Sequence, residues 1–202
     1  MPDVARSIGG LAIGIGALIA AAVGSIAAYY AVGARGPLGP INDILNGAAG
    51  AMTSILAFSL HRHRLGGAVG GVAAAVLGGG VVVWGSILVL TSRTGWLFAG
   101  LVSGVGFALL GVWLALLNRS PAAARFPRGL RRLGVGTGVV MSLGFVLLPA
   151  IVARYDDAES APWWVWLGFQ GLAGTYVLYP VWAIWLGRIL RRPARVRTRR
   201  DA

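Results

Sequence analysis

The sequence predicts an all-α fold: a polytopic integral membrane protein built as one compact bundle of six transmembrane helices, with the N and C termini in the cytoplasm. Hydrophobic residues make up 57% of the 202 residues and charged residues only 12%, with a mean hydropathy of +0.76. Soluble domains carry about 25% charged residues. This composition, six long apolar runs and an uneven distribution of arginine together indicate that lipid is the solvent.

Each apolar run reaches the roughly 18–20 residues that a helix needs to cross the hydrocarbon core. Helices satisfy every backbone polar group within one segment, and the runs lack the alternating polarity of a β-barrel strand. The first run is longer than the roughly 7–15 apolar residues of a signal peptide, so we expect an uncleaved helix. The predicted helices are 8–32, 41–60, 65–90, 96–117, 133–153 and 163–190, which form one domain over 1–190, followed by a basic cytoplasmic tail over 191–202.

Arginine predicts the orientation of the bundle. All 18 basic residues are arginine, and an even number of helices places both termini on one side. If that side is the cytoplasm, 15 arginines lie inside and only Arg35, Arg93 and Arg154 lie outside, as the positive-inside rule requires. The richness in Ala, Gly, Val and Arg is typical of GC-rich bacterial genomes. We therefore expect a multi-pass protein of the bacterial cytoplasmic (inner) membrane.

Several classes of chemistry find no support in the sequence. The chain has no cysteine, which excludes disulfides and thiolate metal sites. No hydrolase, zinc-protease, P-loop or dinucleotide motif is present, so we lean against an enzyme and expect no cofactor. His61 and His63 are two residues apart and point to different faces of a helix, so no metal site is predicted. Asp156, Asp157 and Glu159 form an acidic patch that we interpret as a solvated outer loop.

Polar residues recur at helical spacing on one face of the second predicted helix. Asn42, Asn46 and Thr53 belong to this face, and Asp43 is a charged neighbour. Ionisable and polar residues in a membrane span are candidates for function, and here they suggest a small polar pocket open to the outside. Two simpler interpretations stay open: Asn and Thr stabilise helix contacts by about 1 kcal/mol each, and a carboxylate is favoured in the first turn of a helix. The candidate ligand or ion residues are Asp43, Asn42, Asn46, Thr53 and Gln170.

Prolines suggest where helices bend. Pro149 lies in the fifth predicted helix and Pro180 in the sixth. Proline kinks often accompany cavities, so one hypothesis is that these two helices bend around a pocket.

Arginine clusters and glycine pairs suggest partners. Membrane lipids are expected, with anionic headgroups on the cytoplasmic face, because clustered arginines next to a span attract them. Because membrane orientation accounts for the net charge of +12, nucleic acid is not expected as a partner. Small-xxx-small pairs such as Gly134 and Gly138 either pack the bundle internally or form a homo-oligomer interface. The predicted lipid-contacting residues are Arg62, Arg64, Arg191, Arg192 and Arg195.

These observations lead to two candidate functions. The first is a carrier or channel for a small neutral or cationic solute, supported by the polar face and the prolines. The alternative is a non-catalytic accessory, assembly or lipid-binding scaffold protein, supported by the glycine-rich faces and the basic tail.

Overall fold

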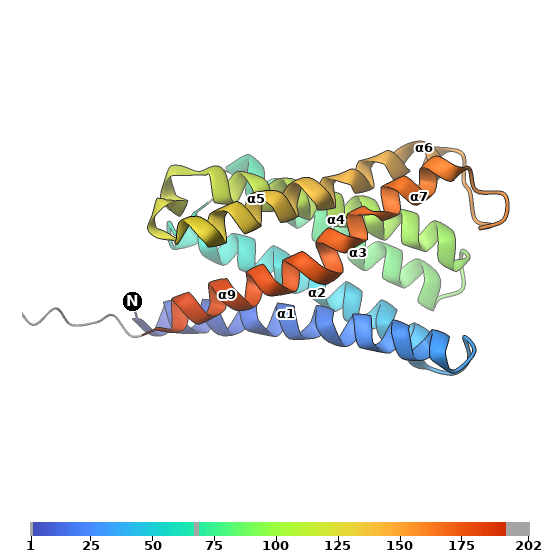
Figure 1. The fold of residues 1–202 in the computed structure, drawn as a ribbon, viewed down its shortest axis with the longest axis horizontal. Helices are drawn as coiled ribbons and strands as arrows, with labels where there is room; N and C mark the ends of the chain where they lie inside the picture. The colour runs from blue at the N-terminus through green and yellow to red at the C-terminus, as the bar shows by residue number, and fades with distance from the viewer. Residues whose placement is uncertain (1, 67–68, 193–202) are drawn as a thin grey trace, which may run out of the picture.

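The computed structural model describes residues 2–66 and 69–192 and is all-helical there, as predicted (Figure 1). The predicted residue Arg195 lies outside the described residues. The first four helices are continuous, and the fifth and sixth are each divided into shorter segments. The elements are α1 (Pro2–Ala31), α2 (Leu38–Arg62), α3 (Val69–Leu90), α4 (Trp96–Arg119), the 3₁₀ turn η1 (Pro121–Arg125), α5 (Arg128–Ser142), the 3₁₀ segment η2 (Leu143–Leu147), α6 (Leu148–Val152), α7 (Trp163–Phe169), α8 (Gly171–Ala173), the π-helical segment η3 (Gly174–Leu178) and α9 (Tyr179–Arg191).

In the described part of the chain, five helices are long and apolar enough to cross a membrane, by length and composition. They cover Asp3–Ala31, Leu38–Arg62, Val69–Leu90, Trp96–Arg119 and Arg128–Val152. The sixth predicted helix is present but broken by the π-helical segment η3. Many large apolar side chains point away from the bundle, including Leu77, Val152 and Trp163, an arrangement compatible with lipid as the solvent.

Helices that are consecutive in the chain lie side by side in the bundle. α1 packs against α2, α2 against α3, α3 against α4, and α4 against α5. The last helix, α9, returns to pack along α1, with the backbone of Gly187 against that of Gly9. The beginning of α1 and the end of α9 therefore lie at the same end of the bundle (Figure 1). We call this the terminal end and the other the loop end.

Glycines bring several of these helices into backbone contact. A Cβ atom at Gly78 would lie 2.7 Å from the carbonyl oxygen of Gly106, and one at Gly111 would lie 2.7 Å from that of Gly138. Only glycine permits such an approach, and close packing stabilises helix pairs in lipid. These glycines therefore pack α3 and α5 against α4 within one chain. A Cβ atom at Gly10 would have no atom of another described segment within 4 Å, and the homo-oligomer remains a prediction.

Three helices begin earlier than the apolar pattern predicts. α1 begins at Pro2, six residues before the predicted start at residue 8. α2 begins at Leu38, three residues before the predicted start, and Pro40 falls in its first turn, where its missing N–H group costs nothing. α5 begins at Arg128, directly after Pro127, because arginine forms helices readily. Polar residues can extend a helix beyond the apolar run that defines a span.

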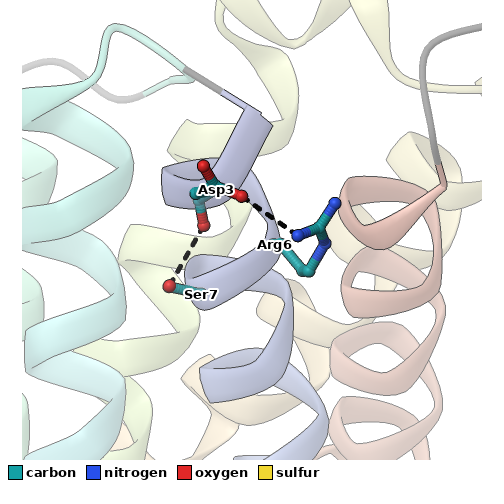
Figure 2. Close-up of polar contacts among 3 residues, drawn as sticks. All are labelled: Asp3, Arg6 and Ser7. Atoms are coloured by element: carbon teal, nitrogen blue, oxygen red, sulfur yellow. Dashed lines mark hydrogen bonds and ion pairs between the residues drawn. The ribbon is translucent and has the colours of Figure 1, made fainter.

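The beginning of α1 carries an exposed ion pair. Nη1 of Arg6 lies 3.0 Å from Oδ1 of Asp3, and Oγ of Ser7 donates a hydrogen bond of 3.0 Å to the Asp3 carbonyl oxygen (Figure 2). Exposed pairs of this kind contribute at most about 1 kcal/mol. They affect the first turn of α1 and leave the packing of the bundle to its buried residues.

Candidate functional site

A cavity of about 680 Å³ opens at the loop end of the bundle. It lies among the end of α1, the beginning of α2, the end of α3 and the beginning of α4, and the sixth helix contributes Phe169, Leu172 and Tyr176. Ligand sites commonly have volumes of about 300–1,000 Å³ and mostly apolar walls with a few polar groups. We refer to this space as the loop-end cavity.

The polar groups of the loop-end cavity come mainly from α2. Asn42, Asp43 and Asn46 all line it. Nδ2 of Asn46 donates a hydrogen bond to Oδ1 of Asn42 at 3.3 Å. Residues four apart share one face of a helix, which explains why Asn42 and Asn46 meet. The structure thus brings three of the five candidate ligand residues together.

Among the residues that the structure describes, Asp43 is the one charged residue that lines the cavity. It is half-buried, and within the part of the chain that the structure describes it forms no ion pair. Because α2 begins at Leu38, Asp43 is its sixth residue and lies beyond the first turn. The stabilisation that a carboxylate gains from the free N–H groups of a first turn does not extend this far. The interpretation of Asp43 as a first-turn residue is therefore wrong.

Asn46 has an oxygen atom without a partner. The residue is 6% exposed, and its Oδ1 has no hydrogen-bond partner among the described residues. An unpartnered buried polar atom costs about 1–3 kcal/mol, so native proteins rarely keep one without a reason. A ligand that donates an N–H or O–H group into the cavity would satisfy this oxygen.

Aromatic rings form much of the remaining wall. Tyr29 and Tyr30 contribute from α1 and pack edge to face, with ring centroids 5.5 Å apart. Phe107 and Tyr176 make a second edge contact at 6.4 Å. Rings attract a cation through their negative faces. The aromatic lining residues are Tyr29, Tyr30, Trp96, Phe107, Phe169 and Tyr176.

The irregular segment of the sixth helix places Tyr176 in the cavity. Tyr176 belongs to the π-helical segment η3 and lines the cavity. Pro180 follows two residues after η3 and has no N–H group to continue the α-helical hydrogen bonds. π-helical turns are rare and frequent at functional sites. Of the two helices that carry the prolines, only the sixth lines this cavity.

Thr53 and Gln170 do not line the cavity. Thr53 is fully buried below it, where its hydroxyl group donates to the Ala49 carbonyl oxygen at 2.7 Å and lies 3.0 Å from Oη of Tyr179. Gln170 is exposed on the outer side of the sixth helix, and its amide donates to the Trp166 carbonyl oxygen at 3.3 Å. Two residues that were not candidates from the sequence, Ser86 and Ser103, also line the cavity.

An aromatic layer closes the bundle below the cavity. Tyr179 stacks on Trp182 with ring centroids 5.8 Å apart, and Trp182 meets Trp113 edge to face at 6.1 Å. All three side chains are at most 1% exposed. Nε1 of Trp182 donates to Oδ1 of Asn118 at 3.3 Å. The cavity is therefore separated from the terminal end by packed side chains.

The other clusters noted in the sequence have different surroundings. Oδ2 of Asp156 accepts a hydrogen bond from the Gly95 N–H group at 2.6 Å, and its Oδ1 accepts one from the Phe98 N–H group at 3.1 Å. The carboxylate therefore caps α4. Among the described residues, no three His, Cys, Asp or Glu side chains gather where they could hold a metal ion. Four of the five predicted lipid-contacting arginines are described, and all lie at the terminal end: Arg62, Arg64, Arg191 and Arg192.

No protein-family model matches the chain, and no curated protein or solved structure matches it. Function is therefore inferred from the geometry of the loop-end cavity.

Proposed function

We propose that the protein is a six-span carrier of the bacterial cytoplasmic membrane that binds a small organic cation in the loop-end cavity. The orientation that supports this places the terminal end in the cytoplasm. Eleven of the described arginines lie at that end, whereas Arg35, Arg93 and Arg154 lie at the loop end. The loop end also carries four of the five described acidic residues. The cavity then faces the outside.

The observation that carries the proposal is the combination of one unpaired carboxylate with an unpartnered acceptor in an aromatic cavity. The Asp43 carboxylate supplies the counter-charge, and Oδ1 of Asn46 accepts a hydrogen bond from the solute. Each ring over a desolvated cation contributes about 0.5–2 kcal/mol. This wall offers an anion no counter-charge, because none of the described residues that line the cavity is an arginine or a histidine.

Two features favour a carrier over an open channel. The pair formed by Thr53 and Tyr179, with the aromatic layer below it, blocks the path to the terminal end. The helix that lines the cavity through Tyr176 is broken by the segment η3. Carriers commonly build their binding sites on discontinuous helices that move between two states. In this mechanism, a shift of the sixth helix opens the layer after the cation has bound.

Flux measurements test the proposal. Proteoliposomes with an inside-negative potential are supplied with radiolabelled choline, a quaternary ammonium ion that carries one hydroxyl donor and crosses lipid slowly. We expect saturable uptake with the wild-type protein and at least tenfold slower uptake with Asp43→Asn. The matched control is Asp157→Asn, which removes a carboxylate at the same end but outside the cavity, and which should stay within twofold of the wild type.

The result that would overturn the carrier is uptake no faster than in protein-free liposomes. If the cation still bound in a manner dependent on Asp43, the cavity would be a receptor site in a non-transporting scaffold. Equal uptake by Asp43→Asn and the wild type would show that transport does not use the loop-end cavity.

A further inference from the structure

A second hollow, of about 580 Å³, lies at the terminal end, where α4 ends and α5 begins. Four of its lining residues are arginines that lie within 14 positions of the sequence. Within the described part of the chain, none of the four forms an ion pair. The hollow is lined by Asn118, Arg119, Arg128, Arg131, Arg132, Val135 and Gly136, and we call it the arginine hollow.

The back wall of the arginine hollow is rigid. Asn118 is 2% exposed, and its Nδ2 donates to the Leu114 carbonyl oxygen at 2.8 Å while its Oδ1 accepts from Trp182. Nε of Arg131 donates to the Asn118 carbonyl oxygen at 3.2 Å. Because a guanidinium group has five N–H donors, this bond fixes the half-buried Arg131 and leaves other donors for a ligand. Gly134 packs its backbone against the Asn118 side chain, which brings the arginines of α5 close to the end of α4.

An apolar surface continues from the arginine hollow along α5. Gly136 is exposed, and no atom lies within 4 Å of the position that its Cβ would take. Val139 is 53% exposed and Leu143 is 39% exposed. Residues three or four apart share a face of a helix, so these positions form one strip that leads from the arginines toward the middle of the bundle. A free inorganic anion would make no apolar contact with this strip, whereas the acyl chain of a lipid would cover it.

We infer that the arginine hollow binds the phosphate headgroup of a membrane phospholipid carrying two or more negative charges, with an acyl chain along Val139 and Leu143. Guanidinium groups bind phosphate oxygens in pairs with matched geometry. Basic pockets between membrane helices bind such headgroups. This inference rests on the membrane insertion proposed above but not on the cation cavity at the other end.

Native mass spectrometry of the full-length protein tests the inference. The protein is released from mixed micelles of a neutral detergent and phosphatidylcholine, titrated with cardiolipin, which has two phosphates. We expect one cardiolipin to be retained, with at least tenfold preference over phosphatidylcholine, and at least fivefold less retention in the double variant Arg128→Gln/Arg132→Gln. The matched control is Arg6→Gln/Arg188→Gln, which removes the same charge at the same end of the bundle, outside the hollow and outside the predicted lipid-contacting residues, and should lose less than twofold.

Two further measurements distinguish specific lipid binding from attraction by charge alone and from binding of free phosphate. The variant Arg128→Lys/Arg132→Lys keeps the charge but loses the paired geometry, so it should also retain less cardiolipin than the wild type. Inorganic phosphate in tenfold excess over cardiolipin should not displace the lipid. Equal loss in the two glutamine variants, full retention in the lysine variant, or displacement by phosphate would each overturn a specific lipid site. Cation uptake should be unchanged in Arg128→Gln/Arg132→Gln. A negative result for the lipid site can therefore be distinguished from a negative result for the cation carrier.

Discussion

The hydroxyl groups of Thr53 and Tyr179 lie 3.0 Å apart, although 126 residues separate them in the chain. Both side chains are buried, at 0% and 1% exposure. This contact joins α2 to the first turn of α9, directly below the loop-end cavity. It links the helix that supplies Asp43 to the broken helix that supplies Tyr176.

A double-mutant cycle should detect this link. Thr53→Val and Tyr179→Phe each remove one hydroxyl group, and we expect each to lower the free energy of unfolding in mixed micelles by about 0.5–1.5 kcal/mol. Each single variant leaves its partner hydroxyl without this contact. The double variant should therefore cost less than the sum of the two, with a coupling of about 0.5 kcal/mol or more. Simple additivity would show that the two hydroxyl groups do not interact.

The variant Asn46→Leu distinguishes a ligand-binding role of Asn46 from a role in helix packing. Leucine has a similar size and removes the unpartnered buried oxygen, so we expect the free energy of unfolding to stay the same or rise by about 1 kcal/mol. Binding of an organic cation should weaken in the same variant. A loss of stability above about 1 kcal/mol with unchanged binding would favour the interpretation of Asn46 as interhelical glue.

The Asp156 carboxylate should stabilise the beginning of α4. It accepts hydrogen bonds from the N–H groups of Gly95 and Phe98, and loss of such a cap costs about 0.5–2 kcal/mol. We expect Asp156→Ala to lower the free energy of unfolding by this amount. Asp157→Ala, one residue along the same loop, is the control and should cost clearly less. Equal effects of the two variants would contradict the assignment of Asp156 as the cap.

Backbone contact between α3 and α4 should make Gly106 intolerant of a side chain. A Cβ atom there would lie 2.7 Å from the Val82 nitrogen and 2.8 Å from the Gly78 carbonyl oxygen. Overpacking of this kind costs about 1–3 kcal/mol, which thermal unfolding in detergent can measure. Gly80→Ala is the control, because no atom lies within 4 Å of its Cβ position, and it should be neutral or stabilising. If Gly106→Ala left the stability unchanged, α3 and α4 would lie farther apart than in this structure.

Sequence periodicity predicted the part of the site that depends on one helix. Asn42, Asp43 and Asn46 line the cavity because they fall within about one turn of a regular α2. Thr53 follows the same spacing but lies deeper, and its contact with Tyr179 depends on the packing of a distant helix. That contact could not be predicted from local pattern.

The irregular sixth helix could not be predicted from the sequence. Gln170 was a candidate because its side chain is polar, and the π-helical segment η3 lies between it and α9. A π-helical turn adds residues to the turn and so rotates one half of the helix relative to the other. Likewise, aromatic residues such as Tyr29 and Trp96 fit a membrane interface by composition, and only the packing of the helices shows that they also line the cavity.

The most direct test of the cation site compares two ions of the same shape and opposite charge, tetraphenylphosphonium and tetraphenylborate. Equilibrium dialysis against the protein in neutral micelles should show one saturable phosphonium site in the wild type and in Asp157→Asn. Asp43→Asn should weaken it at least tenfold, about 1.4 kcal/mol. Because the net charge of +12 favours anions everywhere else, preference for the cation would identify the cavity. Equal affinity of wild type and Asp43→Asn for the phosphonium, or equal displacement by the borate, would contradict the proposed site.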